Sequence, residues 1–433
     1  MADHAPSDGL AVASTPTQPQ PPHNLGHGFR ALHNPNYRNY WIGQVISITG
    51  SWMQTTAQAW LVLQITGSAL SLGTVAALQF LPVTLLALYG GVIADRLRKH
   101  HALVFTQFAL MIQAFIFGLL VALDVIQLWH IYLLAAAQGL VSALDTPVRQ
   151  AFVVEMVGRD DLPNAIALNS MVFNTARILG PSMAGIIIDQ IGIAPALWLN
   201  AVSFLAVLIA LLRMNTALLH AARPATNGSA TKRLIEGVSY AWHTPAILSI
   251  LICVGAIGTF GFNYSVMLPL LARFILKTDA TGFGTLGSFV GIGSLLAALV
   301  TAYLTQITMR RLLLGAGAFS LCFALVALSQ VYFVTAIFLV GMGFAGVTFA
   351  ASSNTLLQLL APDEMRGRIM SLHVLLFMGT TPIGGFFIGA LSDVVGVSIT
   401  LLICAALCLA GTLAAIFYYR QPHPVPQTDT TPA

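Results

Sequence analysis

Long apolar stretches recur along the whole chain and are separated by short polar intervals. An α-helix needs roughly 20 apolar residues to cross the hydrocarbon core of a bilayer. Stretches near this length lie at residues 39–65, 69–94, 102–123, 129–150, 164–189, 194–213, 245–270, 282–306, 311–329, 331–360, 367–393 and 397–419. Because hydrocarbon offers no water to bond free backbone groups, such stretches cross a membrane as helices. The pattern predicts an all-α integral membrane protein with about twelve transmembrane helices in two six-helix, pseudo-symmetric bundles.

The longest polar interval divides the apolar stretches into six and six. Within it, residues 223–228 have the composition of a linker, and the residues that follow predict a short surface helix ending near Trp242. The expected divisions are a disordered cytoplasmic tail over 1–28, a bundle over 29–213, a cytoplasmic linker over 214–244, a bundle over 245–419 and a cytoplasmic tail over 420–433. The first tail is rich in Pro, Gln, His and Ser, and it lacks the apolar segment of a cleavable signal peptide.

The two halves echo each other in sequence. In the fifth stretch Asn169-Ser170 precedes Gly180-Pro181, and in the eleventh Met370-Ser371 precedes Thr381-Pro382. The two segments lie 201 residues apart in the sequence. Two six-helix repeats related by an axis along the membrane normal are typical of parallel-repeat transporters. The echo therefore favours a duplicated transporter fold.

Composition and charge placement strengthen the membrane assignment. Of the 433 residues, 57% are hydrophobic and 8% are charged, whereas soluble domains have about 25% charged residues. Most cations fall on one side of the predicted helices: Arg30, Arg38, Arg96, Arg98, Lys99, Arg149, Arg159, Arg213, Arg223, Lys232, Arg233, Arg310, Arg311, Arg366, Arg368 and Arg420. Arg273 and Lys277 fall on the other side, and Arg177 lies within a stretch. The positive-inside rule predicts a multi-pass bacterial inner-membrane protein with both termini in the cytoplasm.

A basic loop follows the second apolar stretch. It reads Gly90-Gly91-Val92-Ile93-Ala94-Asp95-Arg96-Leu97-Arg98-Lys99 and resembles the major facilitator superfamily loop motif G-x-x-x-D-R-x-G-R-K through Gly91, Asp95, Arg96 and Lys99. Arg98 stands where the family usually has glycine. Glycine allows close helix approach, and a carboxylate at a helix N-terminus beside arginines would stabilise one gate state. An ordinary basic cytoplasmic loop is the alternative.

The fifth stretch contains a proline-glycine motif. The residues from Gly180-Pro181 to Gly185 resemble the G-P-x-x-G motif that exporters of the superfamily place on their fifth helix, with Ile186 in place of a second glycine. Proline kinks a helix and glycine permits close packing, which suits a rocking interface. General helix packing is the alternative.

Three further segments resemble one branch of the superfamily, which includes the bacterial enterobactin exporter and related efflux permeases. They are residues 29–38, residues 144–152 with 162–170, and the run Arg366-Gly367-Arg368-Ile369-Met370-Ser371-Leu372. The resemblance covers roughly residues 29–420. It implies the twelve-helix fold, alternating access and a preference for export.

Polar residues also gather on single helix faces. At 100° per residue, the first stretch places Gln44, Gln54 and Gln58 on one face, and the fourth places Gln138 and Ser142 beside Asp145. Weaker candidates are Thr348, Ser352, Asn263 and Tyr264. Polar groups facing lipid are costly, so we expect these faces to line a central cavity. Hydrogen bonding between helices without any ligand is the alternative.

Three charged residues are candidates for gating or coupling. Asp145 and Arg149 lie near the cytoplasmic mouth. If Asp145 lost its partner Arg149 as a gate moved, protonation of the carboxylate would be coupled to conformation. A salt bridge that does not titrate is the alternative. Arg177 lies near the middle of a span, where a cation is costly. It is either structural, bonded to helix carbonyls, or a ligand for an anionic substrate group.

Other protein classes lack support in the sequence. We expect no enzyme, because the histidines are dispersed and no phosphate-binding G-x-x-x-x-G-K-[ST] motif occurs. We also expect no cofactor, no metal, no nucleic-acid partner and a monomeric state. The favoured function is secondary export of a small amphiphilic or aromatic compound, siderophore-like or drug-like, by antiport with protons. The alternatives are an importer or uniporter of a small organic solute, and a non-transporting membrane scaffold.

Overall fold

The computed structural model describes residues 25–220, 230–303 and 307–420. Within these ranges, the side chains of residues 25–28, 87–96, 230–234 and 302–303 are not described, although their helices are. The predicted first tail, 1–28, therefore lies almost wholly outside the description, as do residues 421–433 of the second.

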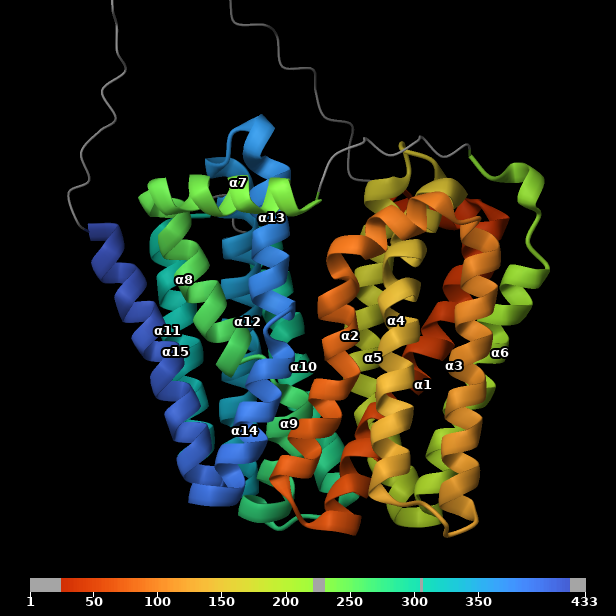
Figure 1. Ribbon diagram of the computed structural model, residues 1–433, viewed down its shortest axis with the longest axis horizontal. Helices are drawn as coiled ribbons and strands as arrows, with labels where there is room; N and C mark the ends of the chain where they lie inside the picture. The colour runs from red at the N-terminus through yellow and green to blue at the C-terminus, as the bar shows by residue number, and fades with distance from the viewer. Residues whose placement is uncertain (1–24, 221–229, 304–306, 421–433) are drawn as a thin grey trace, which may run out of the picture.

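Two groups of helices stand side by side along their long axes (Figure 1). The first group contains η1 (Leu25–His33), α1 (Pro35–Thr66), α2 (Ala69–Arg96), α3 (Lys99–Ala122), α4 (Leu128–Val157), α5 (Leu162–Ile191) and α6 (Ile193–Leu212). The linker contributes η2 (Thr216–Leu218) and α7 (Ala230–His243). The second group contains α8 (Pro245–Phe260), α9 (Tyr264–Leu270), η3 (Leu271–Leu276), α10 (Ala280–Tyr303), α11 (Met309–Leu328), α12 (Tyr332–Leu360), α13 (Asp363–Met378), α14 (Thr381–Val395) and α15 (Val397–Arg420).

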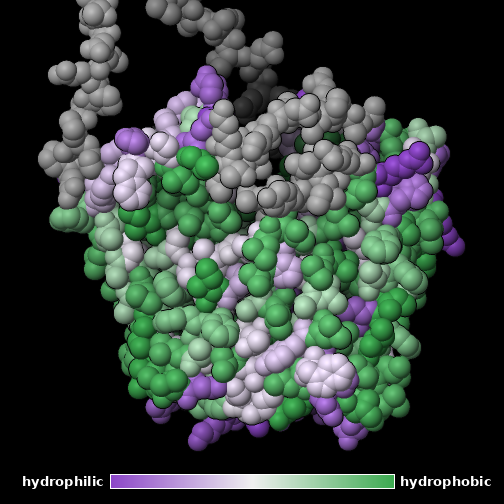
Figure 2. Space-filling view, viewed as in Figure 1, coloured by the Kyte–Doolittle hydropathy of each residue, from purple (hydrophilic) through white to green (hydrophobic). Residues whose placement is uncertain are grey.

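The expected all-α membrane fold of about twelve spans is confirmed. In the described ranges, ten helical segments are long and apolar enough to cross a membrane. The polar α1, of 32 residues, and the succession from α8 to η3 supply the other two crossings. A broad apolar band covers the middle of the molecule, with hydrophilic side chains gathered toward both ends (Figure 2). Side chains such as Phe333, which is 76% exposed, face the lipid.

The seventh span was predicted as one continuous helix, and that prediction is wrong, whereas the eleventh forms the single segment Asp363–Val395 with a turn between α13 and α14. The seventh breaks at residues 261–263, where the Asn263 side chain donates a hydrogen bond to the Thr259 carbonyl oxygen and so competes with the helical backbone bond. The turn in the eleventh lies at residues 379–380, just before Pro382, which has no N–H to continue the helix.

Both described chain ends and α7 lie at the same end of the molecule, the upper end in Figure 1. α7 runs across this end of the second bundle, and the Arg368 guanidinium of α13 forms an ion pair with Glu236 of α7 at 2.8 Å. We call this the inner end, because most cations lie there, and the opposite end the outer end. An even number of crossings follows from the shared position of the chain ends.

The orientation is testable by cysteine labelling. We expect cysteines replacing Arg98 and Arg310 to react with a membrane-impermeant maleimide only in inside-out vesicles, because the cations of the inner end should face the cytoplasm. A cysteine replacing Gln330, between α11 and α12, should react only in right-side-out vesicles. The unsubstituted protein is the background control, since three of its four cysteines are buried and Cys322 is half-buried. Labelling of Arg98 and Arg310 variants from opposite faces would contradict the fold.

Candidate functional site

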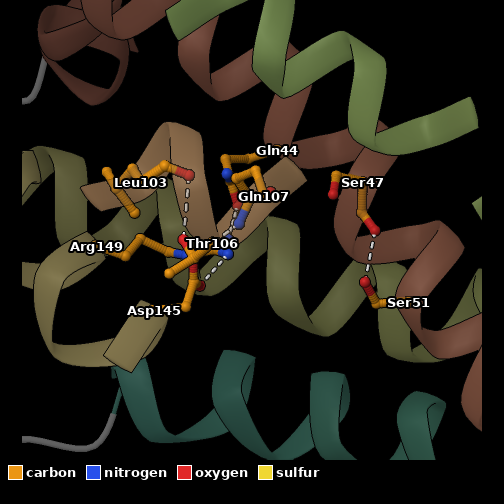
Figure 3. A network of polar contacts seen from close by, with 8 residues as sticks. All are labelled: Gln44, Ser47, Ser51, Leu103, Thr106, Gln107, Asp145 and Arg149. Carbon is orange, nitrogen blue, oxygen red and sulfur yellow. Dashed lines mark hydrogen bonds and ion pairs between the residues drawn. The ribbon is translucent and has the colours of Figure 1, made fainter. Parts of the chain in front are cut away.

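A buried ion pair joins three helices of the first bundle (Figure 3). Asp145 of α4 is 4% exposed, and Arg149, one turn later, donates to it from Nε at 3.0 Å. The same carboxylate accepts hydrogen bonds from Thr106 Oγ1 at 2.7 Å and Gln107 Nε2 at 2.8 Å on α3. Arg149 also donates to the amide oxygen of Gln44 on α1. The charge of Asp145 is therefore fully matched inside one bundle.

Three polar atoms beside this cluster have no hydrogen-bond partner. They are the hydroxyl of Tyr40, Nε2 of Gln44 and Oε1 of Gln107, and all are buried. Tyr40 is held by edge-to-face packing on Phe152, with ring centroids 6.4 Å apart. A buried polar atom without a partner is costly, so these atoms mark a place where a proton or a polar ligand would be stabilised.

A second network of side-chain amides crosses the same bundle nearer the outer end. Gln54, 1% exposed, donates to Gln113 Oε1 at 3.1 Å and, more weakly, to Gln138 Oε1 at 3.5 Å. Asn200 of α6 donates to Gln54 Oε1 at 2.7 Å. These bonds tie α1 to α3, α4 and α6, so Gln54 and its half-buried neighbour Gln138 hold helices together. Gln113 and Asn200 did not emerge from the sequence, because single polar residues on mixed faces give no helical pattern.

The remaining cavity candidates are not all brought together. Gln58 is buried with an unpartnered Oε1, whereas Ser142 is half-buried with no contact to the amide network. Ser352 is buried in α12. Thr348 lies on a separate cavity of about 340 Å³, which is lined by residues of α11 and α12 and by Thr308 just before α11. The polar face of α12 therefore does not meet the polar faces of α1 and α4.

The second bundle contributes aromatic rings where its seventh span breaks. Phe262 stacks on Phe319 with ring centroids 5.3 Å apart, and it contacts Phe377 at 4.8 Å and Tyr264 at 5.9 Å. His373 stacks on Phe377 at 5.7 Å. Asn263, in the same break, is buried with an unpartnered Oδ1. The sequence predicted Asn263 and Tyr264 but not the aromatic cluster, whose members come from three helices and the break itself.

Two helix pairs join the bundles, and both contacts are built from backbone. In the first pair, a Cβ added to Gly73 of α2 would lie 2.6 Å from the carbonyl oxygen of Gly385 on α14. In the second, Gly284 of α10 abuts the carbonyl of Pro181 on α5, and Gly185 abuts that of Ala280. We call these two contacts, α2 with α14 and α5 with α10, the outer seam. Pro181 and Gly185 of the helix-five motif lie in this seam, whereas Gly180 packs on Trp52 of α1.

A carboxylate closes the outer end of each pair. Asp393, near the end of α14, accepts hydrogen bonds from Ser68 Oγ at 2.7 Å and from the backbone N–H of Ala69 at 2.8 Å, at the start of α2. Asp189, near the end of α5, accepts from the backbone N–H of Thr281 at 2.7 Å and that of Ala280 at 3.3 Å, at the start of α10. Negative charge at a helix N-terminus is favourable, so each carboxylate holds the two bundles together.

The outer seam follows a sequence repeat. Asp189-Gln190-Ile191-Gly192 and Asp393-Val394-Val395-Gly396 both read D-x-x-G, at an offset of 204 residues. The glycines end α5 and α14 with φ of +96° and +87°, a conformation that favours glycine. Two D-x-x-G sequences at corresponding helix ends are therefore the sequence signal for both carboxylates.

The loop motif of the inner end is described only at Lys99. Its Nζ lies 2.8 Å from the Glu155 carboxylate, and this pair connects the start of α3 to the end of α4. The side chains of Gly91, Asp95 and Arg96 lie outside the described residues, so their gate role stays a prediction. No group of three metal-binding side chains occurs in the part of the chain that the structure describes.

Comparisons with known proteins give the family. The sequence profile of the family described as transmembrane secretion effector matches residues 27–431. The multidrug efflux pump Tap of Mycolicibacterium fortuitum is 26% identical over 86% of this chain and 92% of its own. The staphyloferrin A transporter of Staphylococcus aureus is 24% identical over 86% and 93%, and the enterobactin exporter EntS of Citrobacter koseri is 25% identical over 86% and 87%.

Solved structures agree on the fold. A bacterial homologue of the human lysosomal transporter Spinster, in an inward-facing and unoccupied conformation, superposes with a TM-score of 0.66. It is 14% identical, and the match covers 90% of this chain and 99% of that one.

The outer carboxylates should hold the seam closed. The probe is a cysteine replacing Ala76, which is buried in the seam, and the readout is its rate of labelling from the outer side. We expect Asp393→Asn and Asp189→Asn each to raise this rate by about two- to fivefold, because each removes a charge from a helix N-terminus. The double variant should exceed both. Asp279→Asn is the matched control, since Asp279 bonds only within its own bundle, to Gly282 N–H and the Thr278 hydroxyl. Equal labelling in all variants would remove the latch role.

Proposed function

The chain belongs to the transmembrane secretion effector family, in the branch of the major facilitator superfamily that includes the enterobactin exporter, and we propose that it exports a small amphiphilic or aromatic organic compound in exchange for protons. It is a multi-pass membrane transporter of a small molecule. The siderophore and drug names of its relatives support the proposed class of substrate.

One observation carries the alternating-access part of the proposal. Every described hydrogen bond between the bundle over 29–213 and the bundle over 245–419 lies in the outer half of the helices. The described side chains of the inner half form no such bond. Among the described residues, the two bundles are thus hydrogen-bonded to each other only toward the outer end, which supports a state closed outward. Export requires the seam to open in turn, and small residues with backbone contacts suit that movement.

We propose the Asp145 cluster as the coupling site. A proton on Asp145 would cancel the charge that matches Arg149, and the guanidinium would then keep only its hydrogen bond to Gln44 of α1. Losing one partner of a buried ion pair is strongly unfavourable, so the protonation state would favour different arrangements of α1, α3 and α4. The unpartnered Tyr40 hydroxyl beside the pair offers a further proton-carrying group.

The transport reaction is tested in proteoliposomes of the purified chain. With the inner end facing the bath, we expect an acidic lumen to drive accumulation of at least one member of a panel of catecholate siderophores and amphiphilic dyes, because protons would leave as solute enters. A protonophore should abolish the accumulation. Protein-free liposomes are the control. Accumulation driven only by sodium would overturn proton exchange, and accumulation of nothing under any gradient would favour a non-transporting scaffold.

Coupling is tested separately by charge removal. Asp145→Asn should abolish accumulation driven by the pH gradient while solute exchange at equal pH continues, because the titratable carboxyl is lost. Since this variant leaves Arg149 buried without its counter-charge, the pair Asp145→Asn with Arg149→Gln provides a folded comparison. Asp124→Asn, at the outer end between α3 and α4, is the matched carboxylate control. Full dependence on the pH gradient in the Asp145 variants would show that this site does not couple.

A further inference from the structure

Arg177 lies on the inner side of the outer seam. Four residues after it on α5, Pro181 packs at Gly287 of α10, where a Cβ would lie 3.3 Å from Pro181 Cβ and 4.0 Å from Leu268 of α9. Four residues before Leu268, and so on the same face of α9, lies Tyr264. Both α5 and α9 run from the inner to the outer end, and Ser288 of α10 donates to the carbonyl oxygen of Ile178, next to Arg177, so Arg177 lies at the inner edge of the seam. Arg177 therefore faces the second bundle where the closed outer half ends.

The guanidinium of Arg177 is poorly satisfied. One nitrogen, Nη2, donates to Asn174 Oδ1 at 3.1 Å, one turn earlier on the same helix. Nε is buried and has no hydrogen-bond partner. No described carboxylate lies within ion-pair distance of it, whereas Lys99, Arg149 and Arg368 have carboxylate partners. Arg311, the other half-buried cation without a carboxylate partner, lies near the inner end of its span rather than near the middle. A cation in the middle of a span without a counter-charge is costly unless something supplies one.

Aromatic rings stand across from this cation. Tyr264 packs edge-on against Phe262, which in turn stacks on Phe319 and contacts Phe377. On the Arg177 side, Phe173 packs against Trp52 of α1 with ring centroids 5.7 Å apart. Rings with one basic group among them match a flat solute that has one acidic group, since the guanidinium fork binds planar carboxylates with two parallel hydrogen bonds.

We propose that Arg177 is the binding residue for an anionic group of the transported compound, which is therefore an aromatic or amphiphilic organic acid. This inference rests on the proposed export function and narrows its substrate class. The bound acid supplies the missing counter-charge to the Arg177 guanidinium and an acceptor to its Nε, and its rings lie against Tyr264 and Phe262. Because Arg177 belongs to one bundle and the rings to the other, bound substrate contacts both moving parts.

The test compares acids with their uncharged amides. The probes are salicylate and salicylamide, naphthoate and naphthamide, and pyrenebutyrate and pyrenebutanamide, with binding to the purified full-length chain measured by calorimetry at low salt. We expect at least one acid to bind about tenfold more tightly than its amide, because a hydrogen bond to a charged group is worth more than one between neutral groups. Arg177→Gln should reduce that ratio to near one, and Arg177→Lys should retain part of it.

Matched controls separate charge from folding. Arg310→Gln removes an exposed cation at the inner end and should leave the acid preference unchanged, and size-exclusion profiles report whether each variant is folded. If no acid is preferred by the unsubstituted chain, or if the preference survives in Arg177→Gln, the anion site is overturned. Transport of an uncharged dye in the proteoliposome assay would meanwhile leave the export function standing, whereas failure of all solutes there contradicts the function itself.

Discussion

Inside hydrocarbon a polar side chain has no water to bond, so it must bond within the protein. Most hydroxyls in these helices meet that demand locally, as Thr49, Ser51 and Thr55 do by donating to the carbonyl four residues earlier. Carboxylates and amides have more polar atoms than one turn of helix satisfies, and several of them reach across to other helices. The Asp145 cluster and the Gln54 network follow from this demand, and together they bind α1, α3, α4 and α6 into one body.

Some of the buried polar atoms without hydrogen-bond partners lie where function is expected. Arg177 Nε and Asn263 Oδ1 lie close to the junction of the two bundles, and the Tyr40 hydroxyl lies beside the Asp145 pair. A bundle that satisfied every polar atom internally would have nothing to offer a solute or a proton. The satisfied networks of the first bundle therefore contribute to stability, whereas the unsatisfied atoms at the junction and at the ion pair are available to a solute or a proton.

The all-α membrane fold could be predicted from the sequence, because the length of each apolar stretch and the placement of charges can be read along the chain. The sequence predicted the twelve spans, the division near residue 214 and the polar faces of α1 and α4. It missed the break in the seventh span, since Asn263 competes for a backbone carbonyl only once the helix is formed. It also missed Thr106, Gln107 and Gln113, which sit singly on α3 and gain meaning only from the α4 side chains that they meet. Contacts between helices depend on rotation and depth, which spacing alone does not determine.

The glycine contacts of the outer seam have a kinetic consequence. Where Gly73 meets Gly385 and Gly284 meets Pro181, main chain touches main chain with no long side chains interlocked between them. Parting these glycine contacts would require no buried rotamer to change, so they would add little side-chain reorganisation to an activation barrier. In the proposed export cycle, the resistance to opening would then come chiefly from the two terminal carboxylates and from the buried stack of Trp60 on Phe283.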